Sequence, residues 1–201
     1  MPPRFSIVIA TRDRQELLER AVKSVIDQSY EDWELIVIDD CSSEPVNLGD
    51  LQIEGYKINI FRNLQNLGPG ASRRKGMALA KGELLCFLDD DDYYLAGHLS
   101  GIIRWMEQNH YDSRLLVTGT VTVISGQGTK IQRVSTPGPK KLKEYWANPV
   151  NLLPFVIPRA IALNCLPSII ASPIEDFEWL CLLLLRYPCS SIDEYSAIYT
   201  V

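Results

Sequence analysis

The sequence predicts an α/β fold with a doubly wound, mostly parallel sheet, and three observations lead to this class. Short apolar runs typical of buried parallel strands alternate with longer stretches in which apolar residues recur at helical spacing. Acidic residues directly follow several of those runs. After residue 112 the pattern changes to shorter stretches rich in Val and Thr, which indicates a short mixed C-terminal extension. We therefore expect a single domain over residues 1–201, with halves at 1–112 and 113–201.

The first half alternates strands and helices. Strands are expected at Phe5–Ala10, Trp33–Ile38, Lys57–Phe61 and Leu84–Leu88, and helices at residues 14–28, 71–81 and 95–109. Pro69 near the start of the second helix and Gly82 just past its end are the usual punctuation of a helix. Residues 44–54 are too weakly patterned to assign. This order of elements is that of a doubly wound parallel sheet.

The second half has a different pattern. Residues 114–124 and 129–134 are expected to be strands joined by the turn at 125–128. Residues 135–151, rich in proline and lysine, are expected to form an exposed loop, and residues 152–172 an irregular segment with a short strand. A last helix is expected over Ile174–Arg186, because Pro188 stops it.

Composition excludes several classes of protein. A net charge of −5 without a basic stripe argues against nucleic acid as the main partner. Five cysteines without a C-x-x-C pair indicate reduced core residues of a cytoplasmic protein, not a disulfide framework or a zinc site. His98 and His110 are expected to be ordinary surface or helix residues. No signal peptide is visible, and the longest strongly apolar run, Trp179–Leu185, is too short to cross a bilayer, although a peripheral membrane association stays open.

Four consecutive carboxylates, Asp89–Asp92, directly follow the apolar run Leu84–Leu88. Two like charges about 5 Å apart repel by roughly 3 kcal/mol at an effective dielectric constant near 20. A cation among them would offset this cost, and Mg²⁺ or Mn²⁺ binds carboxylates together with substrate phosphates. Because ligands of open α/β sheets bind beyond the carboxyl ends of the strands, we expect a metal–phosphate site near residue 90. A solvated acidic turn or a helix N-cap is the alternative interpretation.

Other polar residues are expected on the same rim of the sheet. They are Thr11 and Asp13 after the first strand, Asp39 and Asp40 after the second, and Arg73 and Arg74 on the helix before the acidic run. Carboxylates that hold a metal or accept hydrogen bonds, with arginines that bind phosphate, suit a nucleoside diphosphate. Singly, the aspartate pair could cap a helix and the arginines could form a solvated helical face, so the prediction depends on the joint pattern.

Several stretches match the motifs of one enzyme family in the family's order: Phe5–Arg14, Leu17–Gln28, Trp33–Ser42, Asn66–Arg73, Gly82–Asp92 and Ile174–Trp179. On these stretches the chain resembles glycosyltransferase family 2, the inverting enzymes with the GT-A fold. The resemblance implies a nucleotide-sugar-binding half at 1–112 and an acceptor-side half at 113–201. It implies a nucleoside-diphosphate sugar as donor, UDP by default, with Mn²⁺ or Mg²⁺ as cofactor and a glycan, lipid carrier or protein as acceptor.

The resemblance also assigns roles to individual residues. The nucleotide-binding residues are Thr11 and Asp13 at the base, Asp40 at the base or ribose, and Arg73 near the diphosphate; the metal ligands are Asp89 and Asp91, with Asp91 as the direct ligand. Asp176 matches the base that takes the proton of the acceptor hydroxyl as it attacks the anomeric carbon. The metal offsets the charge that grows on the leaving diphosphate. The alternative is that Glu175 and Asp176 only favour the N-terminus of a helix.

Two other functions stay open. A non-catalytic nucleotide-sugar-binding protein, or a subunit of a larger glycosyltransferase, is favoured by departures from the family's pattern. These are Ala96 in place of proline, Arg74 in place of asparagine, no Gly-Gly pair before Asp176, and a chain that stops at Val201. A signalling receiver domain would also carry aspartates after strands. However, Asp39–Asp40 follows the second strand here, and a long segment follows the acidic run.

Overall fold

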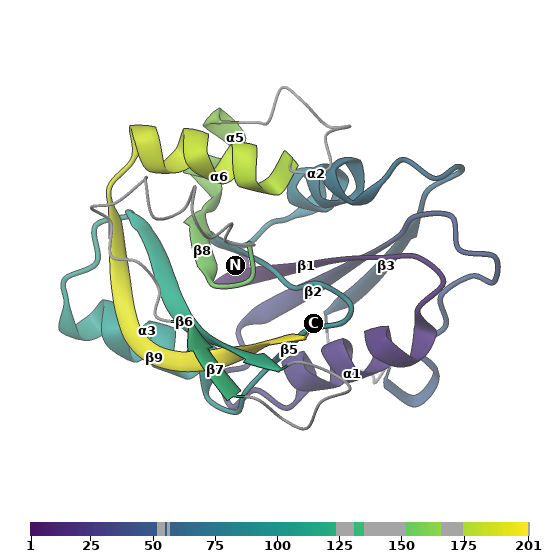
Figure 1. The fold of residues 1–201 in the computed structure, drawn as a ribbon, viewed down its shortest axis with the longest axis horizontal. Helices are drawn as coiled ribbons and strands as arrows, with labels where there is room; N and C mark the ends of the chain where they lie inside the picture. The colour runs from purple at the N-terminus through teal and green to yellow at the C-terminus, as the bar shows by residue number, and fades with distance from the viewer. Residues whose placement is uncertain (52–54, 56, 124–130, 135–151, 166–174, 201) are drawn as a thin grey trace.

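The computed structural model describes residues 1–51, 55, 57–123, 131–134, 152–165 and 175–200. Its central strands are β1 (Phe5–Thr11), β2 (Trp33–Asp39), β3 (Ile58–Arg62) and β4 (Leu84–Phe87). They are parallel and lie side by side in the order β3-β2-β1-β4 (Figure 1). The predicted parallel half of the α/β fold is therefore confirmed: β1, β2 and β4 are buried along almost their whole length, and β3 at the edge is partly exposed.

The same sheet continues into the second half of the chain. The added strands are β5 (Tyr93–Tyr94), β6 (Leu115–Val123), β7 (Ile131–Val134), β8 (Phe155–Pro158) and β9 (Cys189–Thr200). β8 is antiparallel to β4, β6 is antiparallel to β8, and β9 is parallel to β6. β5 pairs with β9 at the far edge, and β7 pairs with β6. The mixed C-terminal extension is thus an extension of one sheet.

Helices cover both faces of the sheet (Figure 1). On one side lie α1 (Gln15–Ile26) and α3 (His98–Gln108); on the other lie α2 (Pro69–Leu79), α5 (Arg159–Asn164) and α6 (Glu175–Arg186). Ile7 and Ile9 of β1 belong to the core on the α1 side, whereas Val8 belongs to the core on the α6 side. Alternate side chains of one strand thus enter different cores, which explains why β1, β2 and β4 consist mostly of apolar residues.

The structure adds elements that the sequence did not predict. β5 is only two residues long. α5 begins directly after Pro158 in a segment expected to be irregular, and β9 mixes polar and apolar residues without a clear period. A short 3₁₀ helix, Gly49–Leu51, lies in the unassigned stretch. The expected loop at 135–151 lies outside the described residues.

His98 and the cysteines test two smaller expectations. His98 begins α3, but it is buried rather than on the surface. Its ring stacks on Tyr94, its Nδ1 lies 2.6 Å from Ser196 Oγ, and burial lowers its pKa to about 3. All five cysteines are free; Cys86, Cys165 and Cys189 are buried, as expected of core residues, whereas Cys41 and Cys181 are only partly buried. Over the part of the chain that the structure describes, every helix is too short or too polar to cross a membrane.

A buried carboxylate fixes the turn that leads into β4. Glu34 on β2 is 4% exposed, and its Oε1 accepts hydrogen bonds from Ser6 Oγ at 2.6 Å and from Lys81 N at 2.6 Å. Gly82 N donates to Ser6 Oγ at 2.8 Å. A Cβ on Gly82 would lie 2.6 Å from the backbone nitrogen of Ser6. Only glycine therefore fits here, and this contact sets where the acidic strand enters the sheet.

We expect Gly82→Ala to lower the free energy of unfolding by about 1–3 kcal/mol, because the added methyl meets backbone atoms that cannot rotate away. Urea unfolding measures this loss. Lys81→Ala is the matched control: its side chain is exposed, so the change should stay within about 0.5 kcal/mol. Equal stability of the two variants would contradict the close approach at Gly82.

Candidate active site

A cavity of about 480 Å³ opens at the carboxyl ends of the parallel strands. Its walls come from the end of β1, the residue after β2, the loop that enters α2 and the acidic run after β4. This is the position at which open α/β sheets bind ligands, and the volume suits a small molecule. Thr11, Asp40, Arg73, Asp89 and Asp91 all line it, so the structure brings together most of the residues singled out from the sequence.

Asp40 is a buried anchor of the cavity wall. Its Oδ1 accepts hydrogen bonds from Asn63 Nδ2 at 2.8 Å and from Leu67 N at 2.9 Å, and its Oδ2 accepts one from Gly68 N at 2.7 Å. Burial raises its pKa, but these hydrogen bonds outweigh burial and leave the pKa below its usual value. The carboxylate therefore holds the loop that precedes α2, and with it the helix that carries Arg73.

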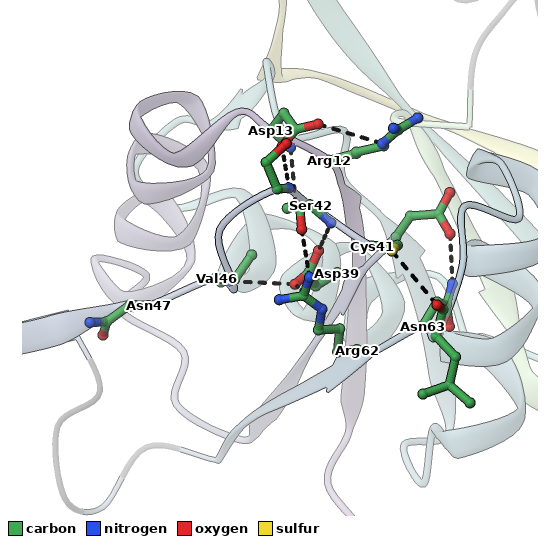
Figure 2. A network of polar contacts seen from close by, with 12 residues as sticks. Arg12, Asp13, Asp39, Cys41, Ser42, Val46, Asn47, Arg62 and Asn63 are labelled. Carbon is green, nitrogen blue, oxygen red and sulfur yellow. Dashed lines mark hydrogen bonds and ion pairs between the residues drawn. The ribbon is translucent and has the colours of Figure 1, made fainter.

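Asp13 lies outside the cavity lining. It has a positive φ of 55°, and its Oδ1 accepts a hydrogen bond from Ser43 N at 2.6 Å, which lowers its pKa (Figure 2). Ser42 is a shared partner, because its Oγ accepts from Asp13 N and its N donates to Asp39 Oδ1. This network joins the turns that follow β1 and β2. Arg12, not Asp13, faces the cavity from this turn.

The first three carboxylates of the acidic run are paired with groups from other elements. Asp89 Oδ1 lies 2.6 Å from Arg73 Nη2. Asp90 accepts a hydrogen bond from Thr11 Oγ1 at 2.7 Å, and Arg14 Nη1 lies 3.0 Å from oxygens of both Asp90 and Asp91. Burial raises the pKa of Asp90, and the contacts with Thr11 and Arg14 oppose that rise. The repulsion expected from the sequence is thus offset by side chains of the protein.

Asp92 does not join the other three, so the expectation of four carboxylates around one cation is wrong for this residue. It is 0% exposed, and its Oδ1 accepts a hydrogen bond from Thr200 N on β9 at 2.8 Å. Its Oδ2 has no hydrogen-bond partner. Burial raises the pKa of the Asp92 carboxyl to about 8, so it is largely protonated at neutral pH.

Sequence reasoning missed the arginines that face this run. Arg12 and Arg14 line the cavity. Arg20 on α1 donates to the Asp91 carbonyl, and its guanidinium carbon lies 4.9 Å from the centre of the Tyr93 ring. A signal existed for Arg14, because it directly follows the strand end that carries Thr11 and Asp13.

The donor set fits a divalent ion that is shared with a substrate. Over the described residues, no three His, Cys, Asp or Glu side chains form a metal cage. Asp89 and Asp91 both line the cavity, with side chains 31% and 36% exposed. Mg²⁺ and Mn²⁺ commonly take one or two carboxylates and complete their shell with water and phosphate oxygens. The residues present are compatible with that mode of binding.

Asp176 is the second residue of α6 and lines a small hollow beside the main cavity. Arg73 and Trp179 line the same hollow. Arg73 also lines the main cavity, so the hollow that holds Asp176 and the cavity that holds the acidic run share this residue. The structure thus brings Asp176, from near the end of the chain, close to the residues that follow the parallel strands.

The match to a known family settles what kind of domain this is. The model of the family described as "Glycosyl transferase family 2" matches residues 6–168. The chain belongs to glycosyltransferase family 2. Among family members, it is 41% identical over 106 residues to the GalNAc(5)-diNAcBac-PP-undecaprenol beta-1,3-glucosyltransferase of Campylobacter jejuni, covering 51% of this chain and 34% of the relative.

A second curated glycosyltransferase and a solved glycosyltransferase structure also resemble this chain. The UDP-Glc:alpha-D-GlcNAc-diphosphoundecaprenol beta-1,3-glucosyltransferase WfgD of Escherichia coli is 30% identical over 105 residues, covering 52% of this chain and 42% of the relative. Staphylococcus aureus TarS 1-349 in complex with UDP-GlcNAc superposes with a TM-score of 0.79 at 20% identity, covering 100% of this chain and 59% of that one. This likeness confirms the GT-A fold. The matches to these two glucosyltransferases span between about a third and two fifths of the relatives' length.

The raised pKa of Asp92 predicts that the stability of this glycosyltransferase domain depends on pH. An unfolded aspartate has a pKa of about 3.9, so between about pH 4 and pH 8 the unfolded chain loses a proton that the folded chain keeps. Stability should therefore fall as pH rises through this window, by up to about 1.4 kcal/mol per pH unit from this group. Asp92→Asn keeps an acceptor for Thr200 N and cannot ionise, so it should gain stability over the wild type as pH rises.

Urea unfolding at pH 5 and pH 8 in EDTA measures this difference. Asp112→Asn is the control: Asp112 is exposed and its partner Arg114 lowers its pKa, so this variant should not gain on the wild type as pH rises. If the stability difference between Asp92→Asn and the wild type is the same at both pH values, Asp92 is not protonated in the folded state.

Proposed function

We propose that this chain carries out metal-dependent, inverting transfer of a sugar from a nucleoside-diphosphate sugar, with UDP as the nucleotide, to an acceptor hydroxyl. The observation that carries the proposal is a single cavity lined by Asp40, Arg73, Asp89 and Asp91, with Asp176 beside it. Membership of glycosyltransferase family 2 supports the class of reaction. The UDP-GlcNAc complex of TarS, which has the same fold, supports a uridine nucleotide.

Donor binding would use the wall built by Asp40 and the cations of the cavity. Thr11 and Arg12 lie at the end of β1, where we propose that the base and ribose bind, with Asp13 supporting this turn from outside. Arg73 faces the cavity from α2 and would bind the diphosphate, because a guanidinium matches phosphate oxygens in geometry and charge.

Asp91 and Asp89 would hold the divalent ion. When bound, Mn²⁺ or Mg²⁺ offsets the negative charge that develops on the leaving diphosphate. Arg73 contributes in the same sense, because its guanidinium lies against Asp89 at the same wall. The protein's part is to keep these groups in place before the reaction, so that little reorganisation is needed as charge develops.

Asp176 is proposed to take the proton from the acceptor hydroxyl. It lies near the N-terminus of α6 and lines a hollow that shares Arg73 with the main cavity, which supports a base that faces the sugar from beside the diphosphate site. Inversion follows because the acceptor oxygen and the diphosphate then lie on opposite sides of the anomeric carbon. A lipid-linked glycan is the acceptor class to test first, because two relatives are named for acceptors linked to undecaprenyl diphosphate.

The free cysteines support a reducing, cytoplasmic location for this reaction.

We expect Asp176→Asn to reduce the rate of sugar transfer by about 10²–10⁴-fold, because the amide cannot accept the proton. UDP affinity should stay within about twofold. Glu178→Gln is the matched control, since it removes a charge from the same helix two residues away and should leave the rate unchanged. A near wild-type rate for Asp176→Asn with an intact fold would remove Asp176 from the base role.

Calorimetry with UDP, with and without Mn²⁺, separates this proposal from a non-catalytic nucleotide-sugar-binding role. Under the proposal, Mn²⁺ strengthens UDP binding, EDTA reverses the effect, and sugar is released from the donor in an activity assay. UDP binding without turnover on any lipid-linked glycan acceptor would favour the binding role.

A further inference from the structure

Arg14 occupies the position between two carboxylates of the acidic run. One atom, Nη1, lies 3.0 Å from Asp90 Oδ1 and 3.0 Å from Asp91 Oδ2. Arg14 is the N-cap residue of α1, so the start of the helix fixes the position of its backbone. Its side chain is nevertheless 51% exposed and lines the cavity. The guanidinium thus neutralises both carboxylates from the solvent side.

The neighbouring cations behave differently. Arg12 lines the same cavity from two residues earlier and is similarly exposed at 48%, but its ion pair is with Asp13, at 3.5 Å. Arg73 holds Asp89 from a side chain that is only 15% exposed. Arg14 is therefore a cation on the acidic run whose half-exposed side chain can rotate away from the partly exposed Asp91, while its other partner, Asp90, is buried and keeps its hydrogen bond from Thr11.

A divalent ion at Asp91 would compete with Arg14 for the same carboxylate. A divalent ion bound to Asp91 and a guanidinium 3.0 Å from the same carboxylate would repel each other. The contact between Asp91 and Arg14 is therefore weakened when the ion binds. An arginine displaced from Asp91 stays at the cavity wall, because its backbone is held by α1. There it would meet the diphosphate of a donor, for which a guanidinium is well suited.

We propose that Arg14 is an exchangeable counter-cation of the acidic run: it neutralises Asp90 and Asp91 in the absence of a divalent ion, yields Asp91 to the ion, and then binds the donor's diphosphate. This positioning role rests on the proposed function, because it assumes that a diphosphate enters the cavity. The proposal explains how the repulsion among these carboxylates is offset before a divalent ion binds.

The exchange predicts effects of opposite sign in one variant, Arg14→Gln. Binding of Mn²⁺ alone should become about three- to tenfold tighter, because a competing cation is gone. Binding of UDP at saturating Mn²⁺ should become about three- to tenfold weaker, because a phosphate contact is gone. Without divalent ions, the Tm should fall by about 2–4 °C, and Mn²⁺ should restore it. Calorimetry and thermal unfolding of the whole chain measure these quantities.

Two matched variants sharpen the test. Arg12→Gln removes the same charge from the same cavity, and its Mn²⁺ affinity should match that of the wild type. Arg14→Lys keeps the charge without the guanidinium fork, and its Mn²⁺ affinity should lie between those of the wild type and Arg14→Gln.

Four results would overturn the exchange. They are weaker or unchanged Mn²⁺ binding in Arg14→Gln, an equal gain in Arg12→Gln, UDP binding unchanged by the loss of Arg14, and no Mn²⁺ binding by any variant. The proposed function fails on a different result, the absence of UDP binding or of sugar transfer by the wild type. If Mn²⁺ binding follows the predicted order but no UDP binds, the competition at Asp91 stands while the proposed function and the transfer of Arg14 to the diphosphate fail.

Discussion

The architecture of the cavity depends on neutralising adjacent carboxylates at the end of a buried strand. Asp89, Asp90 and Asp91 lie close together where β4 ends, and unpaired they would repel one another strongly. The protein supplies arginines from two different helices, Arg73 on α2 and Arg14 at the start of α1. The same ion pairs that relieve the repulsion also connect both helices to the acidic run at the wall of the cavity.

The position of Arg73 depends in turn on Asp40. This buried carboxylate accepts hydrogen bonds from Asn63, Leu67 and Gly68. Asn63 also donates a hydrogen bond to Ser72 on α2 at 3.0 Å. A loop without regular structure is thereby tied to the end of β2, because two of its backbone N–H groups donate to a charged acceptor. Asp40 can thus support a ligand site through the main chain that it positions.

The fourth acid of the run shows how the C-terminal strand joins the site. Asp92 turns inward and accepts the Thr200 N–H of β9, while Tyr93 and Tyr94 pair with Ile198 and Ala197. A fully buried carboxyl with a single hydrogen bond is tolerated because it holds a proton instead of a charge. The last strand of the chain therefore supports the loop whose other carboxylates face the cavity.

Much of the fold follows from the sequence because its patterns are local. The runs at Phe5–Ala10, Trp33–Ile38 and Leu84–Leu88 are apolar apart from Ser6 and Glu34, which fits strands covered on both faces, and the residues after them fall at one edge. For the same reason Thr11, Asp40, Arg73, Asp89 and Asp91 could be expected together. The pairing of β5 with β9 could not be predicted, because these two strands lie more than a hundred residues apart in the sequence.

The tertiary structure alone decided what each charged group does. Sequence shows four identical aspartates in a row; only the packing of β9 and α1 distinguishes the buried Asp92 from Asp90 and Asp91. The tertiary structure likewise pairs Arg14 with the acidic run and Arg12 with Asp13, although the two arginines are only two residues apart. The pKa and pairing of a side chain depend on its distance to groups remote in the chain and on its access to water. No local pattern encodes either quantity.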